Sequence, residues 1–124
     1  MANAYESSLA SDSYVLSPGN LANGTGFIDE IAITPTRVVR RFGAGNPGDN
    51  YKVSRQWAFR KDELVFTLYD WKCTNLYAPD FWTPEELWQS DWPFDLHIGS
   101  KEPATEADVQ AFAAYLQQET SQQA

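Results

Sequence analysis

The feature that most constrains the fold is a pair of alternating segments, residues 51–59 and 64–73, separated by a short polar turn. In the first segment, Trp57 and Phe59 fall on one face of an extended chain and Gln56 falls on the other. In the second segment both faces carry large side chains, as in a strand that is covered on two sides. Because side chains alternate between the two faces of a sheet, these segments predict an antiparallel hairpin at its centre.

Further strands and helices are predicted around this hairpin. Short strands are expected at residues 14–16, 27–34, 36–42 and 94–98. Thr83, Pro84 and Glu86 have the spacing of a capping box, which predicts a short helix, and Thr105 begins a second helix with apolar residues at helical spacing. The sequence therefore predicts an α+β fold: an antiparallel sheet of about five strands, a short helical insertion and a C-terminal helix packed on one face.

The chain of 124 residues has the length of a single domain, 1–124, and no linker or internal repeat divides it. Residues 1–12 and 120–124 are expected to be flexible. No stretch is apolar enough to cross a membrane, and no secretory signal is visible. The single cysteine, Cys73, cannot form an internal disulfide, which fits a reducing cytoplasm.

Charge is distributed unevenly along the chain. The net charge of −8 disfavours a general nucleic-acid coat protein. Residues 37–61 hold seven basic residues and one acid, whereas residues 76–124 hold nine acids and one lysine. This pattern indicates either charged side chains that cover solvated faces, or a local anion site next to an acidic surface.

Tryptophan is the other unusual feature, since five lie between Trp57 and Trp92. Trp57 is expected in the core. Trp82, Trp88 and Trp92 lie in a segment dense with Asp, Glu and Pro, which cannot easily bury all three. Tryptophan and tyrosine stack on bases and stabilise protein interfaces, because they combine a large apolar area with a polar group.

Signals of catalysis are weak. Cys73 and His97 are the single cysteine and the single histidine, and each is expected to have a structural or surface role. No spacing typical of a metal site is present. We therefore expect no catalytic residues, no metal and no cofactor, with a small enzyme built on Cys73 or His97 as the alternative.

The run Thr67-Leu68-Tyr69-Asp70-Trp71-Lys72, together with residues 52–54 and 94–99, resembles small uncharacterised proteins of tailed bacteriophages and prophages. The resemblance covers residues 50–100. It implies a phage accessory protein in the host bacterial cytoplasm. Small acidic phage proteins are often inhibitors of host defence, such as anti-CRISPR proteins, DNA mimics or sponges for nucleotide second messengers.

Two binding modes are expected of such a non-enzymatic anti-defence protein. In the favoured mode, an acidic, Trp-rich surface binds a host immune effector, for example a basic protein that itself binds nucleic acid. In the alternative mode, basic side chains hold the phosphates of a nucleotide second messenger while aromatic side chains stack on its base. A virion or other structural phage component is a third hypothesis. The oligomeric state is left open, a homodimer included.

The candidate binding residues form two groups. The group expected to hold phosphate and base comprises Arg40, Arg41, Lys52, Arg55, Tyr69, Trp71, Lys72 and Trp82. The group expected on the acidic surface, which the C-terminal helix would extend, comprises Glu85, Trp88, Asp91 and Trp92.

Overall fold

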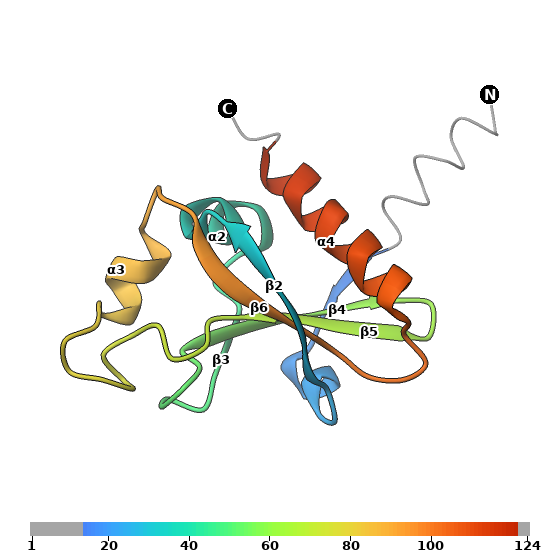
Figure 1. Cartoon of the computed structure of the whole chain (residues 1–124), viewed down its shortest axis with the longest axis horizontal. Coiled ribbons are helices and arrows are strands. Elements are labelled where there is room, and N and C mark those ends of the chain that lie inside the picture. Colours follow the sequence, from blue (N-terminus) through green and yellow to red (C-terminus); the bar gives the residue numbers. More distant parts are fainter. Residues whose placement is uncertain (1–13, 122–124) are drawn as a thin grey trace.

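The computed structural model describes residues 14–121, and in that part of the chain six strands form one antiparallel sheet (Figure 1). The central hairpin consists of β4 (Arg55–Lys61) and β5 (Leu64–Tyr69), joined by a two-residue turn. On one side of the hairpin, β1 (Val15–Ser17) and β3 (Asn46–Pro47) both pair with β4. On the other side, β6 (Phe94–Ser100) pairs with β5, and β2 (Gly26–Ile33) pairs with β6 at the far edge. The predicted central hairpin is confirmed.

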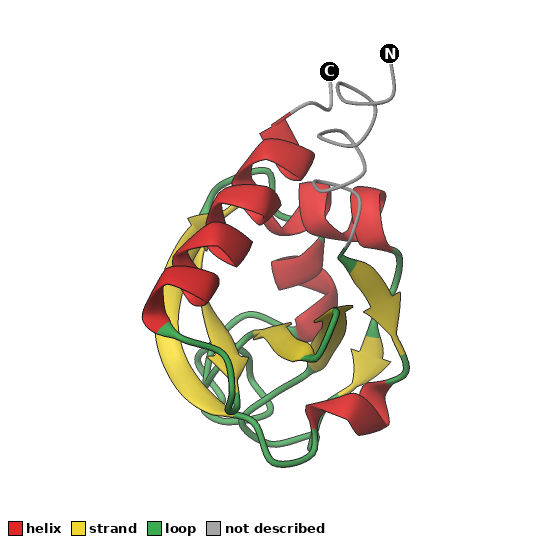
Figure 2. Ribbon diagram, turned by 90° about the vertical axis from the view of Figure 1, so that its right-hand side faces the viewer, coloured by secondary structure: helices red, strands yellow, loops and turns green. Residues whose placement is uncertain are grey.

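The helical elements are η1 (Gly19–Ala22), α2 (Pro35–Phe42), α3 (Pro84–Trp88) and α4 (Glu106–Ser121). Figure 2 shows the long helix α4 lying against the strands of the sheet, and the face that it contacts is called the α4 face. The short turn η1 contacts β4 and β5 on the opposite face, called the η1 face. The predicted α+β class, with a short helical insertion and a C-terminal helix on the sheet, is confirmed.

The core lies between the sheet and α4. Trp57, Leu68 and Ile98 are cross-strand neighbours on the α4 face and are fully buried. Phe66 stacks on Phe112 of α4 with ring centroids 4.6 Å apart. Full burial of each such side chain stabilises the fold by about 1.5–3 kcal/mol, so this layer fixes the position of α4.

On the η1 face, the sheet itself presents small residues at its centre. Ala58, Thr67 and Gly99 are cross-strand neighbours there and all three are buried. A β-carbon at Gly99 would lie 2.5 Å from Thr67 Oγ1, closer than real β-carbons approach, and 3.1 Å from the Gly26 carbonyl oxygen, which is a tight contact. Glycine at this position therefore allows β2 and β5 to lie close to β6.

The strand predicted at residues 36–42 is wrong, because this segment is helix α2. Pro35 occupies the first helical turn, where its missing N–H costs nothing. Val38 and Phe42, four residues apart, are buried on one face of the helix. The β-branched residues that indicated a strand pack into the core equally well from a helix, so packing outweighed their weak strand preference.

The central strands are shorter than predicted. Residues 51–54 are not part of β4, and residues 70–73 are not part of β5. Both segments are loops instead, and they carry most of the candidate site. The strand predicted at residues 94–98 extends to Ser100.

The C-terminal helix continues through Ser121, so the flexibility expected from residue 120 onward is not seen at its first two positions. Thr120 is buried, and its hydroxyl donates to the Leu116 carbonyl. The other ends expected to be flexible, residues 1–12 and 122–124, lie outside the described residues. Among residues 14–121, no helix is both long and apolar enough to cross a membrane.

Candidate functional site

Two loops at the same end of the sheet carry a concentration of exposed aromatic side chains. One loop, residues 48–54, precedes β4, and the other, residues 70–83, follows β5 (Figure 1). The Lys72 N–H donates to the Lys52 carbonyl at 2.7 Å, so the loops lie side by side. The exposed apolar side chains on them are Tyr51, Trp71, Leu76, Tyr77, Phe81 and Trp82.

The first loop is held in shape by Asp49. Its Oδ1 accepts the backbone N–H groups of Tyr51, Lys52 and Val53, each at 2.9 Å. Partial burial acts to raise the pKa of Asp49, but the three N–H donors and the charge of Lys52 outweigh it, so the pKa is lowered. A β-carbon at Gly48 would lie 2.2 Å from the Val53 carbonyl oxygen, so the tight closure requires glycine.

The buried carboxylate of Asp70 joins this loop to the end of β5. It accepts the Ser54 N–H and hydroxyl and the Arg55 N–H, at 2.8–3.1 Å. The Ser54 hydroxyl accepts in turn from Trp88 Nε1 at 2.9 Å. Burial raises the pKa of Asp70 and outweighs these donors, each of which acts to lower it. Asp70 therefore fixes the direction in which the chain leaves β5 toward Trp71.

We define the lysine–aromatic cluster as Tyr51, Lys52, Trp71, Lys72 and Tyr77. The Lys52 ammonium lies 5.5 Å from the Trp71 ring centroid and 5.6 Å from that of Tyr51. The Lys72 ammonium lies 5.6 Å from the Trp71 centroid and 5.0 Å from that of Tyr77. Lys72 has a left-handed backbone (φ 58°), which a non-glycine residue rarely adopts. Two ammonium groups are thus held beside one half-exposed indole.

The second loop closes on itself beyond the cluster. The Asn75 N–H donates to the Trp82 carbonyl at 2.7 Å, and Thr74 is buried beneath the loop. An open apolar groove of about 480 Å³ runs along its base, lined by Lys72, Cys73, Asp80, Phe81, Trp82 and Phe94. The loop therefore keeps Phe81 and Trp82 on the surface, next to the cluster.

A second hollow, of about 600 Å³, lies on the η1 face and is lined by Thr25, Gly26, Phe27, Glu30, Tyr69, Trp71 and His97. Because of the strand register, Tyr69, His97 and Glu30 stand in a row across β5, β6 and β2. His97 Nε2 lies 3.2 Å from a carboxylate oxygen of Glu30. Burial raises the pKa of Tyr69. Trp71 lines this hollow and also belongs to the cluster, so the two features form one continuous site.

The structure brings together half of the residues predicted to hold phosphate and base. Lys52, Tyr69, Trp71 and Lys72 meet at the site, and Trp82 lines the adjoining groove. Arg55 is turned toward the core side, with its guanidinium 5.8 Å from the Trp88 ring centroid.

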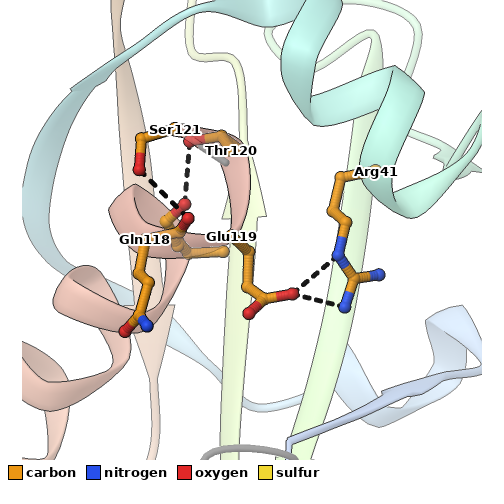
Figure 3. Close-up of polar contacts among 6 residues, drawn as sticks. Arg41, Gln118, Glu119, Thr120 and Ser121 are labelled. Atoms are coloured by element: carbon orange, nitrogen blue, oxygen red, sulfur yellow. Dashed lines mark hydrogen bonds and ion pairs between the residues drawn. The ribbon is translucent and has the colours of Figure 1, made fainter. Parts of the chain in front are cut away.

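The other two predicted residues, Arg40 and Arg41, lie on α2 and do not join the cluster. Arg41 Nε donates to Glu119 Oε1 of α4 at 2.7 Å, as Figure 3 shows. The prediction that these arginines share one anion site with Lys52 assumed that residues 36–42 formed a strand beside β4.

The acidic group is only partly on the surface. The prediction that Trp88 lies on the acidic surface is wrong, because α3 turns its side chain into the core. Trp88 is 3% exposed and packs edge-on against Trp57, with the ring centroids 4.9 Å apart. Asp91 accepts a hydrogen bond from the Thr36 hydroxyl at 3.0 Å. Glu85 lies in the first turn of α3, and Trp92 is 75% exposed.

Sequence reasoning missed several residues of the site. Tyr51 was expected in a strand, and Tyr77 had no assigned role. Phe27 and Glu30 were not singled out, and His97 was considered only for catalysis. The only sequence signal for Glu30 and His97 is their place in predicted strands, and the register that makes them neighbours is not encoded in any local pattern.

Cys73 has the surroundings of a structural thiol. Its Sγ donates to the Trp71 carbonyl at 3.3 Å, and burial raises the pKa of the thiol. A raised pKa keeps the thiol protonated at neutral pH, and a protonated thiol is a poor nucleophile. Within residues 14–121, no three side chains of His, Cys, Asp or Glu are grouped so that they could hold a metal ion.

No protein-family model matches this chain, and a search of curated proteins finds no match either. Its function therefore has to be inferred from the geometry of the site.

Proposed function

We propose that this protein acts without catalysis, by binding an anionic ligand with a planar aromatic group, of the nucleotide class, at the lysine–aromatic cluster. The observation that carries the proposal is the pair of ammonium groups, those of Lys52 and Lys72, within 5.6 Å of the Trp71 ring centroid. Phosphate oxygens accept strong hydrogen bonds from ammonium groups, and bases stack on indole rings.

Local charge supports an anion at this position of an otherwise acidic chain. The neighbouring carboxylates of Asp49 and Asp70 already accept three hydrogen bonds each from donors of residues 51–55. Lys52 and Lys72 contact aromatic faces, and the structure records no ion pair for either of them among the described residues. A ligand phosphate would therefore supply a charged acceptor to both ammonium groups.

The biological setting of this proposal is the one that the phage resemblance suggests. A protein that sequesters a nucleotide second messenger would inhibit a host defence that depends on that signal. Such a sponge needs affinity and abundance rather than catalytic residues.

Isothermal titration calorimetry of the full chain tests the proposal, with the four common ribonucleoside monophosphates and a panel of cyclic nucleotides as ligands. We expect binding that weakens as salt is added. Hydrogen bonds to charged groups are worth about 1.5–3 kcal/mol each. The double variant Lys52→Gln/Lys72→Gln should therefore weaken binding by about tenfold or more.

The matched control is Arg60→Gln/Lys61→Gln, which removes the same charge at the opposite end of β4. This control should bind like the wild type. The proposal fails if no ligand of the panel produces heat, or if the two double variants weaken binding equally.

Trp92 favours a second candidate function, binding of a basic protein partner. Its indole is 75% exposed and lies between the carboxylates of Asp91 and Asp95 in the chain. Exposed tryptophans beside acidic groups are typical of protein-binding surfaces. In this mode the partner would be a host immune effector.

A pull-down from bacterial extract with three forms of the chain separates the two candidates. A basic protein retained by the wild type and by Trp71→Ala, but not by Trp92→Ala, would support the second. A partner lost only with Trp71→Ala would contradict it.

A further inference from the structure

We propose that the hollow on the η1 face is a base pocket that selects nucleobases carrying an exocyclic amino group, with the Glu30 carboxylate as the group that recognises it. This inference rests on the proposed nucleotide-binding function and adds the class of base. It starts from the row of Tyr69, His97 and Glu30 on neighbouring strands.

The walls of the hollow are flat and aromatic. The Phe27 ring lies 4.5 Å from the His97 ring, and the Tyr69 ring lies 5.6 Å from it. The Trp71 ring is 6.0 Å from the His97 ring and inclined to it by only 21°. A hollow of about 600 Å³ lined by such rings accommodates a planar heterocycle, which gains stacking energy from the ring face against which it lies.

The floor is rigid because it belongs to the sheet. The Tyr69 ring packs over Gly99, where a β-carbon would lie 3.4 Å from the ring. The rim formed by residues 22–25 is held by two bonds: the Lys101 ammonium donates to the Asn23 carbonyl at 2.9 Å, and the Thr25 hydroxyl donates to the Ala22 carbonyl at 2.7 Å. The pocket is therefore formed before any ligand arrives.

The polar group of the pocket is an acceptor. Glu30 is half exposed at the rim, and one of its oxygens lies 3.2 Å from His97 Nε2, which orients the carboxylate. A carboxylate accepts hydrogen bonds and donates none, so it favours the amino groups of cytosine, adenine and guanine. It disfavours uracil, which presents a carbonyl oxygen where cytosine presents an amino group.

An organic cation is the competing occupant, because aromatic walls with a carboxylate also suit an ammonium group. The ammonium groups of Lys52 and Lys72 argue against it. Both lie within 5.6 Å of the Trp71 ring centroid, and Trp71 is a wall of the hollow. Two positive charges beside the pocket repel a cation and attract the phosphate of a nucleotide whose base lies inside.

The sharpest test is calorimetry of the full chain with CMP and UMP, two ligands that differ at the position that Glu30 would read. One well-placed base contact is worth about tenfold or more in discrimination, so the wild type should bind CMP at least that much more tightly. The variant Glu30→Gln should lose most of this preference while still binding UMP, because its amide can also donate to a carbonyl oxygen.

Asp29→Asn is the matched control. Asp29 is the neighbouring exposed carboxylate, but it pairs with Ile98 in the register and so lies on the α4 face. This variant should keep the preference for CMP.

Equal affinity for CMP and UMP in the wild type, or an unchanged preference in Glu30→Gln, overturns the base pocket while leaving the lysine-dependent binding of nucleotides intact. Binding of neither CMP nor UMP also overturns the base pocket, and absence of binding by every nucleotide of the calorimetry panel overturns the proposed function as well. Choline is the third probe: if choline binds the wild type but not Glu30→Gln, the hollow is a cation site and the inference is wrong.

Discussion

Two pairs of tryptophans in this chain have opposite structural roles. Trp57 and Trp88 are buried and pack edge-on in the core. Trp71 and Trp82 are exposed on the loop after β5, beside Lys72. Each member of the buried pair donates its indole N–H to a hydrogen-bond acceptor, whereas the side chains of the exposed pair contact neighbouring aromatic rings. The buried pair therefore maintains the fold, and the exposed pair is available to a ligand.

The largest expected effect is the loss of folding stability when a tryptophan of the buried pair is replaced, compared with one of the exposed pair. Trp88→Ala leaves a cavity against Trp57 and removes the hydrogen bond to Ser54, so unfolding free energy should fall by about 3–5 kcal/mol. Trp71→Ala removes an exposed ring with two lysine contacts, each worth about 0.5–1 kcal/mol, so the loss should be about 1–2 kcal/mol. Urea unfolding followed by circular dichroism measures both, and equal losses would contradict the distinction.

Asp70 lies where the two regions meet, because it is bonded to Ser54, which binds Trp88, and it precedes Trp71 in the chain. Its pKa is raised by burial, so the folded chain binds the proton more tightly than the unfolded chain. The stabilising contribution of Asp70 is therefore complete below the ordinary carboxyl pKa and is lost as the pH rises through the raised value. Asp49, whose pKa is lowered, has the opposite dependence: its contribution is present above the ordinary pKa and is lost as the pH falls.

Urea unfolding between pH 3 and pH 7 of the wild type, Asp70→Asn and Asp49→Asn tests these signs. The stability difference between the wild type and Asp70→Asn should shrink as the pH rises, whereas that for Asp49→Asn should grow. If the stability difference from the wild type changed with pH in the same direction for both variants, burial would not govern the pKa of Asp70.

These contrasts also indicate which parts of the structure a sequence can predict. The hairpin of β4 and β5 was predictable because the first segment alternates, the second carries large side chains on both faces, and a short polar turn joins them. Helix α3 was predictable because Thr83 and Glu86 cap it reciprocally. Helix α2 was not, because the β-branched residues after Pro35 favour a strand locally and only packing against the core decides.

The site was predictable in composition but not in arrangement. Tyr69, Trp71 and Lys72 were identified from one short motif. Their partner Lys52 joins them through hydrogen bonds between residues far apart in the chain, one of them from the Lys72 N–H to the Lys52 carbonyl. The hollow depends further on the register of β5, β6 and β2, which the local pattern of each strand leaves open.

The smallest expected effect concerns the basic residues of α2, which resemble Lys52 and Lys72 in charge but not in surroundings. Arg41 is bonded to Glu119 (Figure 3), and its guanidinium lies 5.0 Å from the Phe42 ring centroid. Because the Arg41 side chain is 44% exposed, the ion pair should be worth about 0–1 kcal/mol. Arg41→Ala should therefore lower stability only slightly, and by less at high salt.

The same variant should bind CMP as the wild type does, since the guanidinium of Arg41 is already paired with Glu119 of α4 and lies outside the cluster. A loss of CMP affinity as large as that of the lysine double variant would mean that the anion site extends to α2, and that the distinction between paired and available cations is wrong.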